Sequence, residues 1–426
     1  MKNDRFGGRY SVLSPFKCTY YPDRMKKIEA GEFDQIAPVT AHLVPTLRCN
    51  HRCFFCTYGK LKDADDKAGK ITMEAEKVFS VIDNLKKAGV RGVIFTGGGE
   101  PTCYPHLIEA MRYAKQSGLE IAINTNGVMK QSLISELIRV EPTYIRVSLN
   151  AGSRIVQRLT TGADDYQIVL RNIETMVAFK HQLHTRTDIS VGYVVNVLNV
   201  NDLMDLAETL LEMEQRLERR GIVNGLFSLQ IRPVSNYENS KHMMPESIEG
   251  PANYLEHHVG MEEKLEFLDF MQNGAQCSAK TLQKALKIIE EKLIPLFDRQ
   301  SKIKIVYPRQ KYLDLMHKTG RRYERCLSCP WFLFVWPDGN VYHCVEWAGT
   351  KGFEIGNLNE ASIETILSGE RRAQVLDKIN RSVIQTQCAP VCAHHEMNIF
   401  LNDVSASGGV GCPDGSIEMP KHGCFL

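Results

Sequence analysis

Runs typical of buried strands alternate with runs typical of helices between residues 40 and 235, and this alternation restricts the chain to few folds. Apolar strand-like runs cover residues 92–96, 120–124, 144–149, 190–197 and 227–232. Apolar residues at helical spacing separate them, for example over residues 75–88, 106–117 and 201–219. Such alternation predicts a parallel sheet with right-handed crossovers.

Three cysteines stand close together just after the start of this region. Cys49, Cys53 and Cys56 form a C-x3-C-x2-C run. Three thiolates at this spacing can hold one iron–sulfur cluster and leave one iron without a protein ligand. A structural zinc site normally has four ligands, whereas an open position lets a small molecule bind the metal. The run therefore indicates a reactive site, although alone it would also fit a zinc loop.

A glycine-rich turn follows the strand-like run at 92–96. It contains Gly98, Gly99 and Glu100. Glycine lets a backbone approach a ligand closely. Two later strand-like runs end in short polar residues, Asn124 with Thr125 and Ser148 with Asn150. Singly, such residues are equally compatible with ordinary turns.

Together these motifs resemble the radical S-adenosylmethionine (SAM) enzymes, because Phe55 precedes the last cysteine of the loop and Gly98-Gly99-Glu100 matches the family's GGE motif. The resemblance implies a 4Fe-4S cluster whose open iron chelates SAM, cleavage of SAM to a 5′-deoxyadenosyl radical, and hydrogen abstraction from a substrate. It also implies an electron donor such as flavodoxin or ferredoxin. The implied SAM-binding residues, among which Glu100 would accept from the SAM ammonium, are Phe55, Gly98, Gly99, Glu100, Asn124, Thr125, Ser148 and Asn150.

The resemblance narrows the expected α/β fold to a partial (β/α)6 TIM-like barrel. We expect it over residues 40–235, after an N-terminal lead-in at 1–39. Helical periods at 261–272 and 278–299 predict a helical linker over residues 236–325. A small cysteine-rich α+β domain would follow over residues 326–426.

A second group of cysteines lies in that last part. Pro337-Asp338-Gly339-Asn340 is a hairpin turn signal that would bring Cys329 and Cys344 together. The spacing resembles the SPASM and twitch extensions of radical SAM enzymes, which hold auxiliary iron–sulfur clusters. We expect one auxiliary 4Fe-4S cluster, and a structural zinc knot is the alternative. Its ligands would be Cys326 or Cys329, together with Cys344, Cys388 and Cys392.

Other residues of the same types have simpler interpretations. Cys18, Cys103 and Cys277 stand alone and are expected to be buried apolar residues. A metal role for Cys412 and Cys424 is left open. The run of His394, His395 and Glu396 would supply polar contacts near the auxiliary cluster.

Composition excludes several classes of protein. The net charge of +2 and the absence of a basic run disfavour nucleic acid as a partner. No apolar run is long enough to span a membrane, and no signal-peptide pattern opens the sequence. We expect a cytoplasmic protein. In such a protein, thirteen cysteines indicate metal binding rather than disulfides.

The substrate is the least defined element of the prediction. Residues 388–400 resemble the ends of SPASM-type enzymes that act on sugars and aminoglycosides. We therefore expect a carbohydrate-like small molecule that is oxidised, dehydrated or epimerised. A peptide-modifying maturase is the alternative within the family, and a non-catalytic iron–sulfur electron-transfer protein is the alternative outside it.

Overall fold

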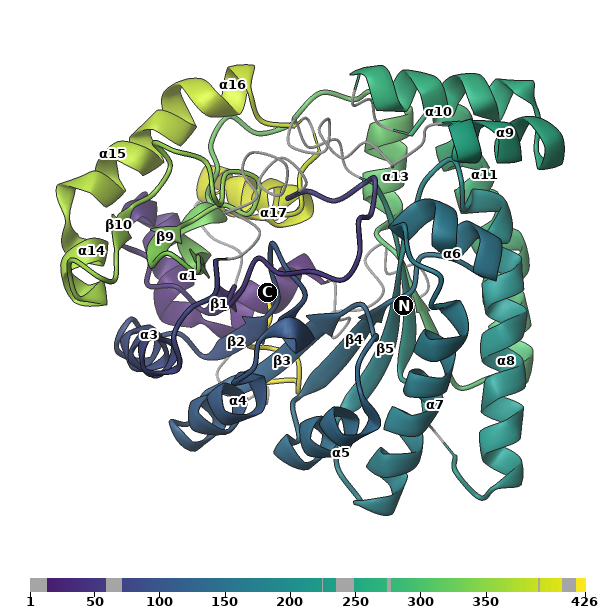
Figure 1. Cartoon of the computed structure of the whole chain (residues 1–426). Coiled ribbons are helices and arrows are strands. Elements are labelled where there is room, and N and C mark those ends of the chain that lie inside the picture. Colours follow the sequence, from purple (N-terminus) through teal and green to yellow (C-terminus); the bar gives the residue numbers. More distant parts are fainter. Residues whose placement is uncertain are drawn as a thin grey trace.

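One sheet of ten strands, in the order β10-β9-β8-β1-β2-β3-β4-β5-β6-β7, forms the centre of the computed structural model (Figure 1). The structure describes residues 14–58, 71–223, 225–234, 249–273, 277–389, 391–407 and 419–426. Neighbouring strands from β8 through β1 to β7 are parallel, and β9 and β10 are antiparallel to their neighbours. The first six strands are β1 (Thr40–Leu43), β2 (Gly92–Phe95), β3 (Glu120–Thr125), β4 (Tyr144–Ser148), β5 (Asp188–Val195) and β6 (Ser228–Pro233).

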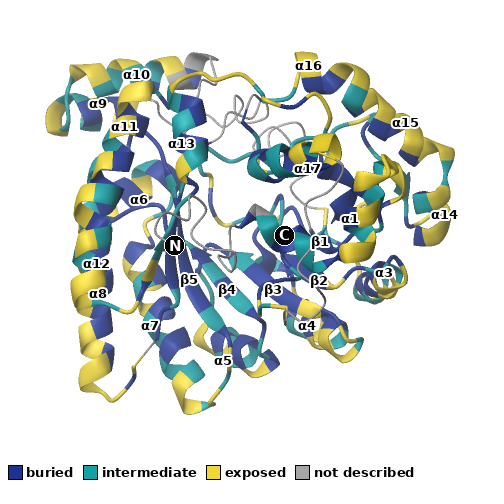
Figure 2. Ribbon diagram, turned by 180° about the vertical axis from the view of Figure 1, so that it is seen from behind, coloured by how far each residue is buried: buried dark blue, intermediate teal, exposed yellow. Residues whose placement is uncertain are grey.

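Helices cover the outer face of this sheet because each has an apolar side. They are α3 (Ala75–Lys87), α4 (Leu107–Gln116), α5 (Gln131–Val140), α7 (Tyr166–Gln182) and α8 (Leu203–Arg219). The short helix α6 (Arg154–Thr161) instead contacts the cysteine loop, and its buried residues are mostly polar. In α3, Val78, Val81, Ile82 and Leu85 recur at helical spacing and are all buried in the main core. Figure 2 shows the same division in the outer helices, with buried residues toward the sheet and exposed residues toward solvent.

The predicted partial barrel is confirmed, and strands from later segments extend it. The segment predicted as a helical linker also contributes β7 (Lys304–Val306), which pairs with β6. Its helices are α9 (Glu249–His258), α10 (Met261–Asn273), α11 (Ala279–Ile288), the π-helical turn η7 (Ile289–Leu293), α12 (Ile294–Gln300) and α13 (Arg309–Met316).

The cysteine-rich part joins the other side of the sheet. β8 (Phe332–Val335) pairs with β1, and β9 (Asn340–Tyr342) returns beside β8 through the predicted hairpin turn. The remaining elements are the short turn η8 (Cys329–Trp331), β10 (Gly356–Asn357), α14 (Ile363–Ser368), α15 (Glu370–Lys378), the π-helical turn η9 (Ile379–Val383), α16 (Ile384–Thr386) and α17 (His395–Ser407). Because β8 is hydrogen-bonded to β1, the two cysteine-bearing parts of the chain share one sheet.

The two terminal segments meet at the amino ends of the barrel strands. The first elements are η1 (Pro15–Tyr20), α1 (Pro22–Glu29) and η2 (Phe33–Gln35). The Thr40 hydroxyl, at the start of β1, donates to the Cys424 carbonyl at 2.8 Å and accepts from the Leu426 amide at 3.1 Å. Phe425 is buried edge-to-face against Tyr144 at the start of β4. Residues 419–426 therefore close this end of the barrel. Within the described ranges, no helix has both the length and the apolar character that a membrane span requires.

Candidate active site at the carboxyl ends of the strands

The cysteine loop after β1 is held by its backbone and by one buried histidine. The amide of Arg52 donates to the Thr161 carbonyl at the end of α6, at 2.7 Å. His51 is buried, and its Nε2 lies 2.7 Å from Oδ2 of Asp165. Burial alone would raise the pKa of Asp165, but hydrogen bonds from His51 and Gln157 outweigh it and leave that pKa lowered. The loop is thus fixed while Cys49, Cys53 and Cys56 stay partly exposed and outside any disulfide.

The glycine turn after β2 packs directly on this loop. Glu100 donates its backbone N–H to the Arg48 carbonyl at 2.7 Å. A Cβ on Gly99 would lie 2.4 Å from the Arg48 carbonyl oxygen and 2.5 Å from that of Thr46. A Cβ on Gly98 would lie 2.7 Å from Cδ2 of Leu47. Glycine is required at both positions because a larger residue would push the turn away from the cysteines.

The Glu100 carboxylate is already engaged by the protein. It is 4% exposed, and Oε1 accepts from the Thr125 hydroxyl at 2.6 Å and from the Thr102 amide and hydroxyl at 3.1 and 2.9 Å. Oε2 accepts from the Asn126 amide at 2.7 Å. Asn126 in turn donates to Asn50 in the cysteine loop at 2.6 Å. Glu100 therefore joins β2, β3 and the cysteine loop, and Oε2 retains one acceptor direction for a ligand.

The other predicted SAM-binding residues differ in what they contact. Thr125 bonds Glu100 and accepts from the Gly127 amide, and Asn150 accepts from the Val194 amide at 2.7 Å. Both side chains therefore have structural partners. Ser148 ends β4, and Phe55 lies edge-to-face against Phe54. Asn124 donates to the Thr96 hydroxyl, while its Oδ1 is buried with no hydrogen-bond partner among the described residues.

The second group of cysteines gathers beside the hairpin. The sulfur atoms of Cys326 and Cys329 are 3.2 Å apart, and the Cys329 thiol is also hydrogen-bonded to that of Cys344. The amide of Cys326 donates to Asn380 in η9 at 2.7 Å, and the guanidinium of Arg321 donates to the Cys388 and Ala389 carbonyls at 2.9 and 2.8 Å. The two cysteine-bearing segments are thus anchored separately, one by η9 and the other by the segment that follows α13.

The electrostatics of these thiols fit a bound cationic centre. Burial, followed by the charges of Cys344 and Cys326, raises the pKa of Cys388 to about 12. Burial also raises the pKa of Cys392, and the hydrogen bond from Cys329 lowers that of Cys326 to about 6. Crowded, buried thiols of this kind become thiolates when they coordinate metal. In the described part of the chain, no three Cys, His, Asp or Glu side chains are placed to hold a single metal ion.

Two aromatic residues lie between the cysteine groups. Tyr58 follows the first loop, and its ring centroid is 5.3 Å from that of Trp336 in the hairpin. Burial, followed by the charges of Cys56, Glu346 and Cys344, raises the pKa of Tyr58. A Cβ on Gly98 would lie 3.1 Å from the Trp336 ring. The two cysteine sites therefore face the same region.

A cavity of about 200 Å³ lies inside the barrel and reaches the cysteine-rich part. His42, Asn124, Arg146 and Arg232 line it from the strands, and Glu396 lines it from α17. Burial lowers the pKa of His42 to about 3 and raises that of Glu396 to about 7. The predicted polar run 394–396 is split here, since His395 turns away and its Nε2 lies 3.1 Å from Asp314.

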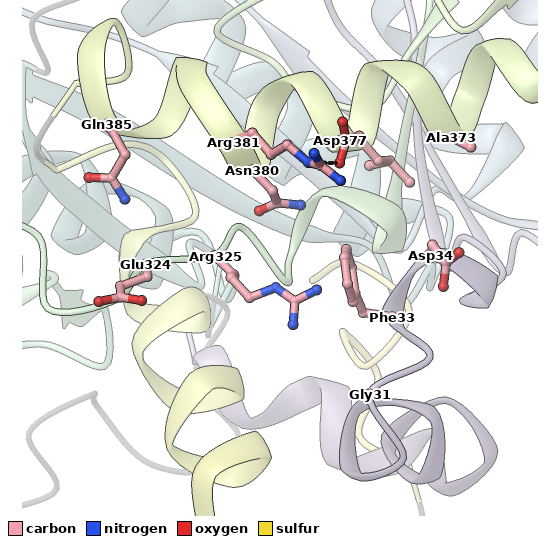
Figure 3. Close-up of a pocket in the computed structure, with 11 residues that line it drawn as sticks. Gly31, Phe33, Asp34, Glu324, Arg325, Ala373, Asp377, Asn380, Arg381 and Gln385 are labelled. Carbon is pink, nitrogen blue, oxygen red and sulfur yellow. Dashed lines mark hydrogen bonds and ion pairs between the residues drawn. The ribbon is translucent and has the colours of Figure 1, made fainter.

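A larger hollow, of about 710 Å³, lies elsewhere, between η2 and the α15–η9 helix (Figure 3). Its two arginines have partners of their own. Arg381 pairs with Asp377 at 2.5 Å, and the Arg325 guanidinium lies 4.4 Å from the centre of the Phe33 ring. The smaller barrel cavity is the better candidate for chemistry, because the predicted SAM-binding residue Asn124 lines it together with His394, which follows the second group of cysteines.

The family models match the two cysteine-bearing parts of the chain. The model of the radical SAM superfamily matches residues 43–236, and that of the SPASM iron–sulfur cluster-binding domain matches residues 326–394. The chain belongs to the radical SAM superfamily. This radical SAM enzyme binds SAM and a 4Fe-4S cluster, and its SPASM domain carries an auxiliary cluster.

Individual known proteins are similar to this chain only at low sequence identity. A probable GTP 3′,8-cyclase from Thermococcus kodakarensis is 26% identical over 163 residues, which are 38% of this chain and 50% of that protein. The chain thus spans about half the length of the curated relatives it matches. The crystal structure of Streptococcus suis SuiB with the precursor peptide SuiA has a TM-score of 0.55 at 12% identity, over 82% of this chain and 70% of SuiB. The structure of anSMEcpe with bound AdoMet has a TM-score of 0.54 at 14% identity, over 87% and 96%. These two structures share the fold.

Several residues of the site were missed from sequence. Asn50 and His51 occupy variable positions of the cysteine motif, and Asp165 and Asn126 stand outside any motif, yet all four hold the cysteine loop. Asn126 stands next to the predicted Thr125, and only its position at the strand end could have indicated it. Cys424 lies at the amino end of the strands, where it contacts Thr40, far along the barrel from the cysteine loops. Cys412 lies outside the described residues.

Proposed function

We propose that this radical SAM enzyme cleaves SAM reductively and abstracts a hydrogen atom from a small polar substrate bound inside the barrel. The observation that carries the proposal is the contact between Tyr58, which follows the first cysteine loop, and Trp336 of the cysteine-bearing hairpin. Asn124 from the barrel and His394 from the auxiliary segment line one cavity. When bound, SAM and its reduced cluster supply the 5′-deoxyadenosyl radical. The protein's own contribution is to hold the substrate close to that radical and to exclude water.

The residue assignments follow from the same arrangement. We assign Cys49, Cys53 and Cys56 to the SAM-binding cluster, and Cys344, Cys388 and Cys392 with Cys326 or Cys329 to the auxiliary one. We assign SAM to the surface formed by Phe55, Gly98, Gly99, Glu100, Asn124, Thr125, Ser148 and Asn150. The free acceptor direction of Glu100 and the unpartnered Oδ1 of Asn124 support that assignment. Residues 40–235, 236–325 and 326–426 remain the proposed functional units, with flavodoxin or ferredoxin as electron donor.

For the substrate we retain a carbohydrate or aminoglycoside-like molecule. A polar cavity lined by Asn124, Arg146 and Glu396 supports a ligand rich in hydrogen-bonding groups. The GTP 3′,8-cyclases act, by their name, on GTP, which is also small and polar. The likeness to SuiB is one of fold, so its precursor peptide does not carry over to this chain.

Formation of 5′-deoxyadenosine tests the proposal. Anaerobically reconstituted protein should release it from SAM when dithionite is present. Cys53→Ala should release none, because the first cluster then lacks a ligand, and it should keep the spectrum of the auxiliary cluster. Cys277→Ala is a matched control, since this buried thiol donates to the Val195 carbonyl away from both loops. Equal product from Cys53→Ala and the wild type would refute the proposal.

A further inference from the structure

Arg146 projects from the middle of β4 into the barrel. It lies opposite Asn124 of β3 and Ser190 of β5 in the register of the sheet. Gly192 makes room for it, because a Cβ there would lie 3.3 Å from Cδ of Arg146. Burial, followed by repulsion from Arg232, lowers the pKa of Arg146 to about 9. The guanidinium is therefore still a cation at neutral pH.

Among the described residues, no carboxylate pairs with this half-buried cation. The guanidinium makes no hydrogen bond to any described residue, and its Nε is buried without a partner. Within the described ranges, the charged or titratable groups that influence the pKa of Arg146 are Arg232 and Tyr144, and neither is a carboxylate. Buried charges in proteins are normally paired, because desolvating an unpaired one costs several kcal/mol.

A structural arginine elsewhere in the chain shows the usual pattern. Arg372 is buried, and its guanidinium donates to His343 at 3.0 Å, to the Ile36 carbonyl at 2.9 Å and to the Leu367 carbonyl at 3.3 Å. Its role is explained by these bonds. Arg146 differs because it faces the cavity of about 200 Å³ with its donors unused by the described residues.

The one carboxylate side chain that lines this cavity belongs to another group of charges. Glu396 enters from α17, and the charges that act on it are those of Lys311 and Asp314. His394 and His42 also face the cavity, and burial holds both neutral by lowering their pKa values to about 4 and about 3. Among the described residues, Arg146 therefore has no counter-ion in this cavity.

We propose that Arg146, with Arg232 beside it, binds an anionic group of the substrate, either a carboxylate or a phosphate, inside the barrel. The inference rests on the proposed function, because it specifies the substrate of that reaction. The cavity is smaller than a typical ligand pocket of 300–1,000 Å³, so it would hold the charged end of the substrate. Arg146 precedes Ser148 by two residues and so lies about 7 Å deeper in the barrel than the strand end assigned to SAM.

Calorimetric titration of the reconstituted protein tests this assignment, with inorganic phosphate and with acetate at constant ionic strength. The wild type and Arg171→Gln, which changes an exposed arginine of α7, should bind at least one anion equally well. Arg146→Gln should weaken that binding at least about tenfold, and Arg146→Lys should weaken it less because the charge remains. Binding of phosphate without binding of acetate would identify a phosphorylated substrate. Binding of acetate without binding of phosphate would identify a carboxylated one. The absence of binding to the wild type, or equal binding to Arg146→Gln, would overturn the proposal.

A second arm uses only the wild type and separates substrate from SAM. Saturating SAM should leave the affinity for the anion unchanged within about twofold, because the two sites differ in depth. Loss of anion binding on addition of SAM would instead assign Arg146 to the SAM carboxylate and would overturn the proposal. The assay for 5′-deoxyadenosine on the same preparation tests SAM cleavage alone, so the two failures are distinguishable.

Discussion

The Glu100 carboxylate accepts a hydrogen bond from the backbone amide of Asn126 at 2.7 Å, and the Asn126 side chain then donates to Asn50 in the cysteine loop at 2.6 Å. The glutamate of the GGE motif is thus connected to the loop that carries Cys49 and Cys53. It fixes the relative position of two motifs that are separate in sequence. A ligand that bound this carboxylate would therefore meet a group whose position β3 and the cysteine loop already fix.

Glu100→Gln should therefore destabilise the protein even without SAM. The amide nitrogen of the new side chain would face either the three donors at Oε1 or the Asn126 amide, and one donor would lose its acceptor. Leaving a buried donor unpaired costs roughly 1–3 kcal/mol. Urea unfolding of the apoprotein measures this cost, and Glu360→Gln, at an exposed position, should leave stability unchanged. If Glu100→Gln unfolds at the wild-type midpoint and loses only SAM affinity, the carboxylate serves the ligand and not the fold.

Gly99→Ala should separate the glycine turn from the cysteine loop. The added methyl group would lie 2.4–2.6 Å from backbone atoms of Thr46, Leu47 and Arg48, which cannot rotate away as a side chain could. We expect a loss of about 1–3 kcal/mol and poor retention of the first cluster. Gly320→Ala is the matched control, since nothing lies within 4 Å of its Cβ position. Normal iron content and stability in Gly99→Ala would contradict the requirement for glycine.

The sequence predicted the parts of the site that are local and missed the parts that come together only through the fold. The strand-to-helix alternation and the hairpin at Asp338-Gly339 depend on neighbours in sequence, and both are confirmed. The contact between His51 and Asp165 joins residues more than a hundred positions apart, so no local pattern could indicate it. The same holds for the parallel pairing of β8 with β1.

Glu100 illustrates a different limit. Its motif marked it correctly as special, but a motif does not say how many of its acceptor positions the protein itself occupies. Arg146 is the opposite case, because no sequence motif distinguishes it from any other arginine in a strand. Its importance appears only when the cavity is seen together with the lack of a counter-ion for Arg146 among the residues that the structure describes.

Lys17 should make stability depend on pH in the alkaline range. Burial lowers its pKa to about 7, partly offset by the charges of Cys424 and Cys18, and its ammonium donates to the Phe425 carbonyl. Between about pH 7 and its ordinary value of 10.5, the unfolded chain binds a proton at Lys17 that the folded chain does not. Stability should therefore fall as pH is lowered through this window, by up to about 1.4 kcal/mol per unit, and level off below pH 7.

Urea unfolding of the apoprotein between pH 7 and 9.5 measures this slope. Lys17→Met should reduce it, because the titrating group is gone. Lys26→Met removes an exposed lysine of the next helix, α1, and should keep the wild-type slope. A slope that is unchanged in Lys17→Met would show that other groups produce it.

Cys344→Ala should remove the auxiliary iron and leave the first cluster in place. Cys344 is hydrogen-bonded to the buried Cys329, and its charge influences the pKa of Cys388. It therefore lies between the Cys326–Cys329 segment and the Cys388–Cys392 segment of the second site. After anaerobic reconstitution the wild type should contain about eight irons per chain, and the variant about four, with SAM cleavage by the first cluster as the independent readout. Zinc is measured on the same samples, because the two interpretations of this site differ in the metal that disappears. If the variant loses one zinc and no iron, the second site is structural, and net oxidation of the substrate through it is excluded. If it loses iron, a redox role for the SPASM domain becomes consistent with the position of Tyr58 and Trp336 between the two sites.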